Sequence, residues 1–183
     1  MSDIAFHITD VTNNSLAAGA NRIGVEVTLR DGELMVVVWD NGCGMESEIL
    51  GRVTDPFFTS RTTRHVGLGI PLLCQAAEMT GGSVTIESQA GCGTRIEAVF
   101  LTGDVDCPPA GDIPEAIALL ISGTAGVDLN VTFTCGTRCF KTSSGQLARI
   151  FGTVPLGIPA VASAIQEFIS FNFEDVFAGR LPV

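Results

Sequence analysis

Apolar residues recur along the chain with helical spacing in some segments and strand-like spacing in others. Over residues 3–20 the spacing is that of an amphipathic helix. Residues 22–41 predict two strands joined by Asp31-Gly32, a dipeptide typical of tight hairpins. The second of these strands is apolar on both faces, so we expect it in the centre of a sheet.

The next sixty residues predict a similar mixture. A short helix is expected over residues 45–53, and a loop bearing glycine and proline over 55–69. A helix over 70–82 and a second hairpin over 83–101, with its turn at 90–93, follow. The helices and hairpins do not alternate strand by strand, so a purely parallel sheet is not expected.

A change in composition at residues 103–112, GDVDCPPAGD, predicts a boundary. We therefore divide the chain into a domain over residues 1–102, a linker over 103–111 and a small extension over 112–183. The extension is expected to hold a helix, a hairpin and two more helices, at residues 113–123, 127–142, 144–152 and 158–177.

The predicted fold class is α/β (α+β), a two-layer sandwich. We expect a mixed, largely antiparallel sheet with helices on one face, plus a small C-terminal helix-hairpin-helix extension. The chain has 183 residues, of which 46% are hydrophobic and 16% charged, so it can form a substantial core.

The charge and the termini narrow the class of protein. A net charge of −10 argues against a general nucleic-acid binder. No apolar run approaches the roughly 18 residues of a membrane helix, and the first residues lack the basic start of a secretion signal. We therefore expect a cytoplasmic protein that binds neither nucleic acid nor membrane.

Basic residues and cysteines each leave alternatives open. Arg52, Arg61 and Arg64 lie within one short stretch and could hold an anion, or they could be solvated surface residues. The six cysteines resemble no disulfide framework, and a C-x-x-x-C pair, Cys135 and Cys139, cannot complete a four-ligand metal site alone. We therefore favour a structural role for the cysteines over metal or redox chemistry.

Three glycine-bearing stretches, DNGCGM, VGLG and AGCGT, are candidates for ligand contact. Glycine lets a ligand approach the backbone, and VGLG at a helix start would direct free N–H groups at a phosphate. Asp10 and Asn14 share one helix face, with His7 three residues before Asp10. Asp10 suits a general base and Asn14 suits a neighbouring Mg²⁺ ligand, although a solvated polar face would have the same pattern.

Together these stretches carry a family resemblance. NNSLAAGANRI, WDNGCGM, DPFFTSR followed by VGLGI, and GCGTRI resemble the ordered boxes of the GHKL, or Bergerat-fold, ATP-binding superfamily over residues 3–101. This superfamily includes DNA gyrase, the heat-shock chaperone, MutL and sensor histidine kinases. NSLAAGA is close to the MutL-like members, whereas DPFFTSR and the short loop before GLG are closer to histidine kinases.

The resemblance implies ATP or ADP and Mg²⁺ as cofactors. Asn14 matches the asparagine that binds Mg²⁺ and phosphate, and Asp10 matches the catalytic general base. That acid is usually Glu, and the shorter Asp bears on catalysis and not on binding. Asp40 matches the residue that accepts a hydrogen bond from the adenine amino group, which would select ATP over GTP. Thr94 matches a threonine that helps to hold adenine.

The remaining matched residues surround the nucleotide on other sides. Glycines that let adenine lie against the backbone, an aromatic box, and a loop that contacts phosphate are matched by Gly42 and Gly44, by Phe57 and Phe58, and by Gly67, Leu68 and Gly69. Arg61 and Arg64 fall in the expected ATP lid and are candidates for the β- or γ-phosphate.

Three functions of different classes follow. The first is a free-standing kinase of the histidine-kinase type that transfers the γ-phosphate to a partner protein in bacterial signalling. No phosphoacceptor box precedes the first helix, so self-phosphorylation by the usual route is not expected. The second is an ATPase switch whose lid closure controls a protein interaction, and the third is a non-catalytic nucleotide-binding adaptor. The protein partner could be another protein or, in a homodimer, a second copy.

Overall fold

The structure is a computed structural model of the chain and describes residues 2–55 and 68–182. Helices and strands within these residues follow one another in this order: α1 (Ile4–Ala17), β1 (Arg22–Arg30), β2 (Glu33–Asp40), α2 (Ser47–Leu50), α3 (Gly69–Met79), β3 (Ser83–Gln89), β4 (Gly93–Leu101), α4 (Ile113–Gly123), β5 (Asp128–Cys135), β6 (Arg138–Ser143), α5 (Ser144–Phe151) and α6 (Pro159–Phe177).

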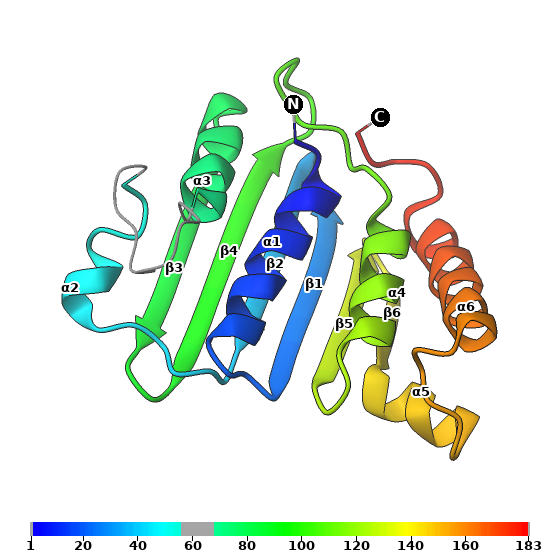
Figure 1. Cartoon of the computed structure of the whole chain (residues 1–183). Helices are drawn as coiled ribbons and strands as arrows, with labels where there is room; N and C mark the ends of the chain where they lie inside the picture. The colour runs from blue at the N-terminus through cyan, green and yellow to red at the C-terminus, as the bar shows by residue number, and fades with distance from the viewer. Residues whose placement is uncertain (1, 56–67, 183) are drawn as a thin grey trace.

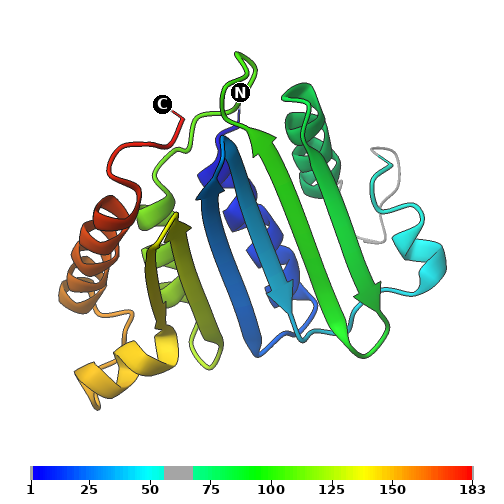
Figure 2. The ribbon, with the colours of Figure 1, turned by 180° about the vertical axis from the view of Figure 1, so that it is seen from behind.

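One sheet of six strands organises the molecule, in the order β3-β4-β2-β1-β5-β6. β1 and β5 run parallel, whereas the other neighbouring strands are antiparallel. Helices α1, α3 and α4 lie in front of the sheet in Figure 1, and Figure 2 shows the opposite face of the sheet turned to the viewer. The predicted two-layer α/β architecture, with a mixed and largely antiparallel sheet, is confirmed.

Local sequence explains the first helix and hairpin. Asp3 caps α1, because its Oδ1 accepts the N–H of Phe6 at 2.7 Å. Asp31 and Gly32 both have positive φ angles, 52° and 83°. A two-residue turn of this kind matches the twist of its flanking strands, so β1 and β2 pair from their first residues beyond the turn. β2 lies inside the sheet, as its apolar pattern predicts.

The hairpin of the C-terminal segment extends this same sheet, which the sequence pattern does not predict. β5 pairs with β1 in a parallel register that begins at Arg22 opposite Asp128. The segment before α4 also contacts the start of α1, because the carbonyl of Pro109 accepts the N–H of Ile4 at 3.0 Å. The division at residues 103–111 remains a prediction about domains, since these contacts do not test independent folding.

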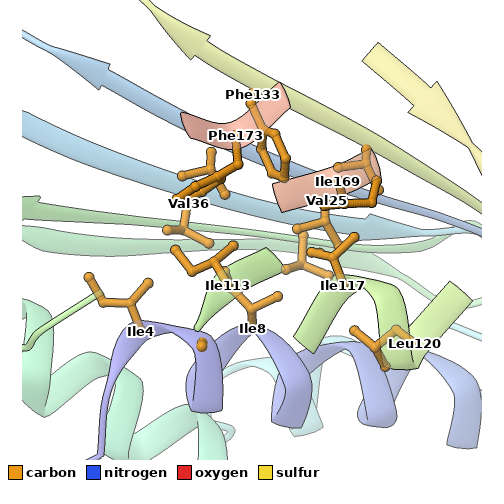
Figure 3. Packing of buried hydrophobic residues seen from close by; sticks show 14 of the residues in the cluster. Ile4, Ile8, Val25, Val36, Ile113, Ile117, Leu120, Phe133, Ile169 and Phe173 are labelled. Atoms are coloured by element: carbon orange, nitrogen blue, oxygen red, sulfur yellow. The ribbon is translucent and has the colours of Figure 1, made fainter. Parts of the chain in front are cut away.

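Within the described residues, one cluster of buried apolar side chains runs between the sheet and the helices (Figure 3). Ile8 of α1, Ile117 of α4 and Phe133 of β5 are each at most 1% exposed. The ring of Phe133 contacts Phe173 and Phe177 of α6, at centroid distances of 5.1 and 6.1 Å. This aromatic packing holds α6 against the added strands, and the cluster joins them to the first half of the chain.

Candidate functional site

The candidate site begins where β2 ends. Asp40 is the last residue of β2 and lies opposite Thr94 of β4 in the ladder. Its carboxylate is only partly buried and is held on both oxygens. Oδ2 accepts the hydroxyl of Ser15 in α1 at 2.7 Å, and Oδ1 accepts the N–H of Gly42 at 2.7 Å. A carboxylate has about four lone-pair directions, so Asp40 keeps capacity to accept from a ligand.

A second polar group stands beside Asp40, on the β3–β4 hairpin. The hydroxyl of Ser88 lies 2.9 Å from that of Thr94. It also accepts the N–H of Met45 at 2.9 Å and lies 3.0 Å from the carbonyl oxygen of Gly93. Ser88 therefore ties the segment after β2 to the start of β4 and orients Thr94 toward the Asp40 end of the sheet.

Glycine is required at three positions around these groups because the backbones approach so closely. A Cβ on Gly42 would lie 2.9 Å from the carbonyl oxygen of Ala18. A Cβ on Gly44 would overlap the carbonyl of Gln89, and one on Gly93 would overlap the carbonyl of Asp40. Gly44 and Gly93 also have positive φ angles, 63° and 96°. Gly42 and Gly93 are buried and Gly44 is partly exposed, so these glycines let the turns pack closely around the Asp40 carboxylate.

The start of α3 brings a further predicted residue to α1. A Cβ built on Gly69 would overlap the carboxylate oxygen Oδ2 of Asp10, so the Asp10 side chain lies directly against the Gly69 backbone. Leu68, which precedes α3, is 40% exposed. Asp10 and Asn14 are both partly exposed and lie one turn apart on α1. α1 therefore presents Asp10 to α3 and Ser15 to Asp40.

His7 does not join Asp10 on the accessible face, although the helical spacing suggested that it would. Its side chain is 2% exposed and lines a cavity of about 10 Å³ under α1, too small for more than about one water molecule. Nε2 is 3.1 Å from the Ser2 hydroxyl, whereas Nδ1 has no partner among the described residues. Burial lowers the pKa of His7, and the nearby Asp10 and Asp3 carboxylates oppose this shift.

The other predicted nucleotide contacts cannot be placed. Phe57, Phe58, Arg61, Arg64 and Gly67 all lie outside the described residues.

Conversely, two residues that motif reasoning did not single out take part in the site. Ser15 follows the matched Asn14, and Ser88 faces Thr94 across the hairpin. Counting back from the turn predicted at 90–93 places Gln89 opposite Thr94, whereas the observed turn is one residue shorter and places Ser88 there.

Comparison with known proteins decides the family. The sequence model of the family described as "Histidine kinase-, DNA gyrase B-, and HSP90-like ATPase" matches residues 4–103. The chain belongs to this family. The matched region runs from α1 to just beyond β4 and contains every described residue of the candidate site. Membership in this ATPase family implies nucleotide binding.

Several curated relatives of this ATPase domain are histidine kinases of bacteria. The chain is 37% identical over 70 residues to histidine protein kinase DivJ of Caulobacter vibrioides, covering 36% of this chain and 12% of that protein. It is 28% identical over 106 residues to sensor histidine kinase YxdK of Bacillus subtilis, covering 54% and 33% respectively. It is 29% identical over 110 residues to sensor kinase CckA of Brucella abortus, covering 60% and 12%.

These relatives are longer proteins, since the chain spans only 12% to 33% of their lengths. A solved structure, "Crystal Structure of N terminal domain of a DNA repair protein", has the same fold, with a TM-score of 0.58 and 13% sequence identity. The likeness covers 85% of this chain and 59% of that one, so it extends past the region that the family model matches.

None of the helices in residues 2–55 and 68–182 has the length and apolar content needed to cross a bilayer. Within the same residues, no three His, Cys, Asp or Glu side chains gather as a metal site would require.

Proposed function

We propose that the chain binds Mg²⁺-ATP at the end of the sheet where β2 meets β4, with adenine against Asp40. The observation that carries this proposal is the Asp40 carboxylate, which Ser15 and the Gly42 backbone hold from two sides while leaving room for a third donor. Adenine offers such a donor, its exocyclic amino group, and the glycines beside Asp40 let a flat base approach the backbone. Guanine has a carbonyl at that position, so Asp40 would favour ATP over GTP.

The phosphates would extend from this end toward Asp10, Asn14 and the start of α3. Asn14 supplies a neutral oxygen of the kind that Mg²⁺ accepts. Gly69 stands at the positive end of an 11-residue helix, and its lack of a side chain leaves room for the Asp10 carboxylate beside the backbone N–H groups. The oxygen donors therefore fit the metal, which would neutralise phosphate charge when bound.

We further propose that the chain is a kinase that transfers the γ-phosphate to a protein partner in bacterial signalling. Asp10 would be the general base, because it is the carboxylate that α1 directs at the start of α3. The match to bacterial histidine kinases supports this choice over the other functions. The Asp at this position, shorter than the Glu usual in the family, supports the alternative of an ATPase switch or a non-catalytic adaptor.

Calorimetry with ATP and ADP, with and without Mg²⁺, tests the binding. We expect the wild-type chain to bind ATP more tightly with Mg²⁺, and an Asn14→Ala variant to lose that difference. Asn172→Ala is the matched control, because Asn172, like Asn14, is a partly exposed helical asparagine, and it lies on α6, far from the site in sequence. Absence of ATP binding by the wild-type chain, or an equal effect of the two variants, would contradict the proposal.

The fate of the γ-phosphate separates the three activities. Radiolabelled ATP with candidate partner proteins should label a partner if the chain is a kinase, and should release free phosphate if it is an ATPase switch. Tight ATP binding with neither outcome would select the adaptor.

A further inference from the structure

Two of the glycine turns at the candidate site each contain an exposed cysteine. Cys43 lies between Gly42 and Gly44 after β2, and Cys92 lies in the turn between β3 and β4. Both thiols are free and solvent-exposed. The two GCG stretches are 49 residues apart in the sequence, counted from Cys43 to Cys92, so only the folded sheet brings them together.

Backbone contacts place the two turns against each other on either side of the cysteines. The N–H of Gly91 donates to the carbonyl of Cys43 at 2.7 Å. On the other side, Gly93 packs so tightly on Asp40 that a Cβ there would overlap the Asp40 carbonyl. The residues that flank Cys92 therefore contact the segment that holds Cys43, both at Cys43 itself and three residues before it.

Cys92 directly follows Gly91, so its Cα lies about 3.8 Å from that of a residue hydrogen-bonded to Cys43. Disulfides join Cα atoms separated by about 4.4–6.8 Å, a separation within reach of two turns in direct contact. The other cysteines differ in place and access. Cys135 is buried, burial raises the pKa of the Cys74 and Cys107 thiols, and the exposed Cys139 lies at the opposite end of the sheet.

We propose that Cys43 and Cys92 form a redox pair, a modification site whose oxidised form is an intramolecular disulfide that joins the two turns. The oxidant would be a low-molecular-weight disulfide such as glutathione disulfide. One cysteine thiolate attacks a sulfur of the oxidant, forming a mixed disulfide and releasing one glutathione thiolate. The second cysteine thiolate attacks the protein sulfur of that mixed disulfide and releases the second glutathione. Two electrons pass to the oxidant, and the two thiol protons end on the released glutathione thiolates.

The pair is coupled to the nucleotide site, and this part of the inference rests on the proposed function. Gly42 immediately precedes Cys43, Asp40 lies three residues before it, and Thr94 lies two residues after Cys92. A covalent link would hold the turns in one arrangement and draw Gly42 with them. Coupling between two sites typically amounts to about fivefold or more in affinity, and we expect the oxidised chain to bind ATP about that much more weakly.

The test oxidises the full chain with glutathione disulfide and maps the peptides under non-reducing conditions. We expect one dominant cross-link, Cys43 to Cys92, which dithiothreitol removes. Cys92→Ser should carry glutathione on Cys43 in place of the cross-link, whereas Cys139→Ser should form the cross-link as the wild type does. Modification of Cys139 without any Cys43–Cys92 link would overturn the proposal, because the oxidant would then have acted and the pair would not have formed.

Calorimetry on the reduced and oxidised chains tests the coupling separately. Equal ATP dissociation constants in the two states would overturn the coupling. The mapping does not depend on nucleotide, so failure of the proposed ATP binding would leave the cross-link result intact and would be recognised as a separate failure.

Discussion

Replacing Asp40 by Asn should weaken ATP binding without unfolding the protein. Asn keeps the shape of the side chain and can retain both protein contacts. Its oxygen can accept the N–H of Gly42, and its amide can donate to Ser15, whose hydroxyl can turn toward the Val11 carbonyl 3.4 Å away. The side of Asp40 that faced Ser15 then carries donors, so an adenine amino group would meet another donor there.

The magnitude follows from the bond that is lost. A hydrogen bond to a charged group contributes about 1.5–3 kcal/mol, so the ATP dissociation constant should rise by about 10- to 150-fold. The free energy of unfolding should fall by only about 1 kcal/mol, because both protein contacts persist in neutral form. The variant should also bind GTP better than the wild type does, because the Asn amide can donate to the guanine carbonyl.

Calorimetric titrations of ATP and GTP, with urea unfolding of the same samples, measure all three quantities. Asp31→Asn is the matched control, because this substitution makes the same chemical change in an exposed turn at the other end of β2. Wild-type ATP affinity in a folded Asp40→Asn chain would refute the assignment of Asp40 to adenine. A parallel loss of ATP and GTP binding would refute the reasoning about base selection.

Three further perturbations follow from the packing. Gly69→Ala should displace the Asp10 carboxylate and reduce the rate of phosphotransfer or hydrolysis by about 100-fold or more, with little change in melting temperature. The control is Gly123→Ala, which should leave the rate unchanged because a Cβ at Gly123 meets nothing within 4 Å. Phe133→Ala should lower the free energy of unfolding by about 3–5 kcal/mol in a urea titration, because the ring is fully buried; a change under about 1 kcal/mol would contradict the described aromatic packing. Burial lowers the pKa of His7, so the unfolded chain takes up a proton at a higher pH than the folded chain does. The contribution of neutral His7 to the free energy of unfolding should be fully present above about pH 6.5 and should decrease as the pH falls below that value. His7→Gln should flatten the pH dependence of the free energy of unfolding in that range.

Local signals in the sequence predicted the fold where neighbouring residues determine it. Asp31-Gly32 predicts the first hairpin because both residues adopt positive φ angles there. The start of α3 was predicted one residue late, at 70, because the glycine at 69 was read as part of the preceding loop. Nothing local marks β5 as the partner of β1, since a parallel pair has no turn between its strands.

The positions of the site residues could be predicted from the sequence, but the contacts that depend on how helices pack could not. The positions of Asp40 and Thr94 follow from their motifs, and the ladder pairs them directly. The support of Asp40 by Ser15 depends on how α1 lies over the sheet, which spacing along the helix cannot specify. The burial of His7 has the same cause, because a periodic pattern does not show how deeply α1 is covered by α3 and β4.

The parallel pairing of β1 with β5 also orders events during synthesis. β1 is complete at Arg30, but its second neighbour is Asp128–Cys135, so about 100 residues must be added before that edge can close. Ribosomes add about 5–20 residues per second, so the edge stays open for several seconds. An open, apolar strand edge is a template for pairing with other chains. A nascent chain, or one cut after β4, should therefore depend on chaperones and aggregate more readily than the full chain.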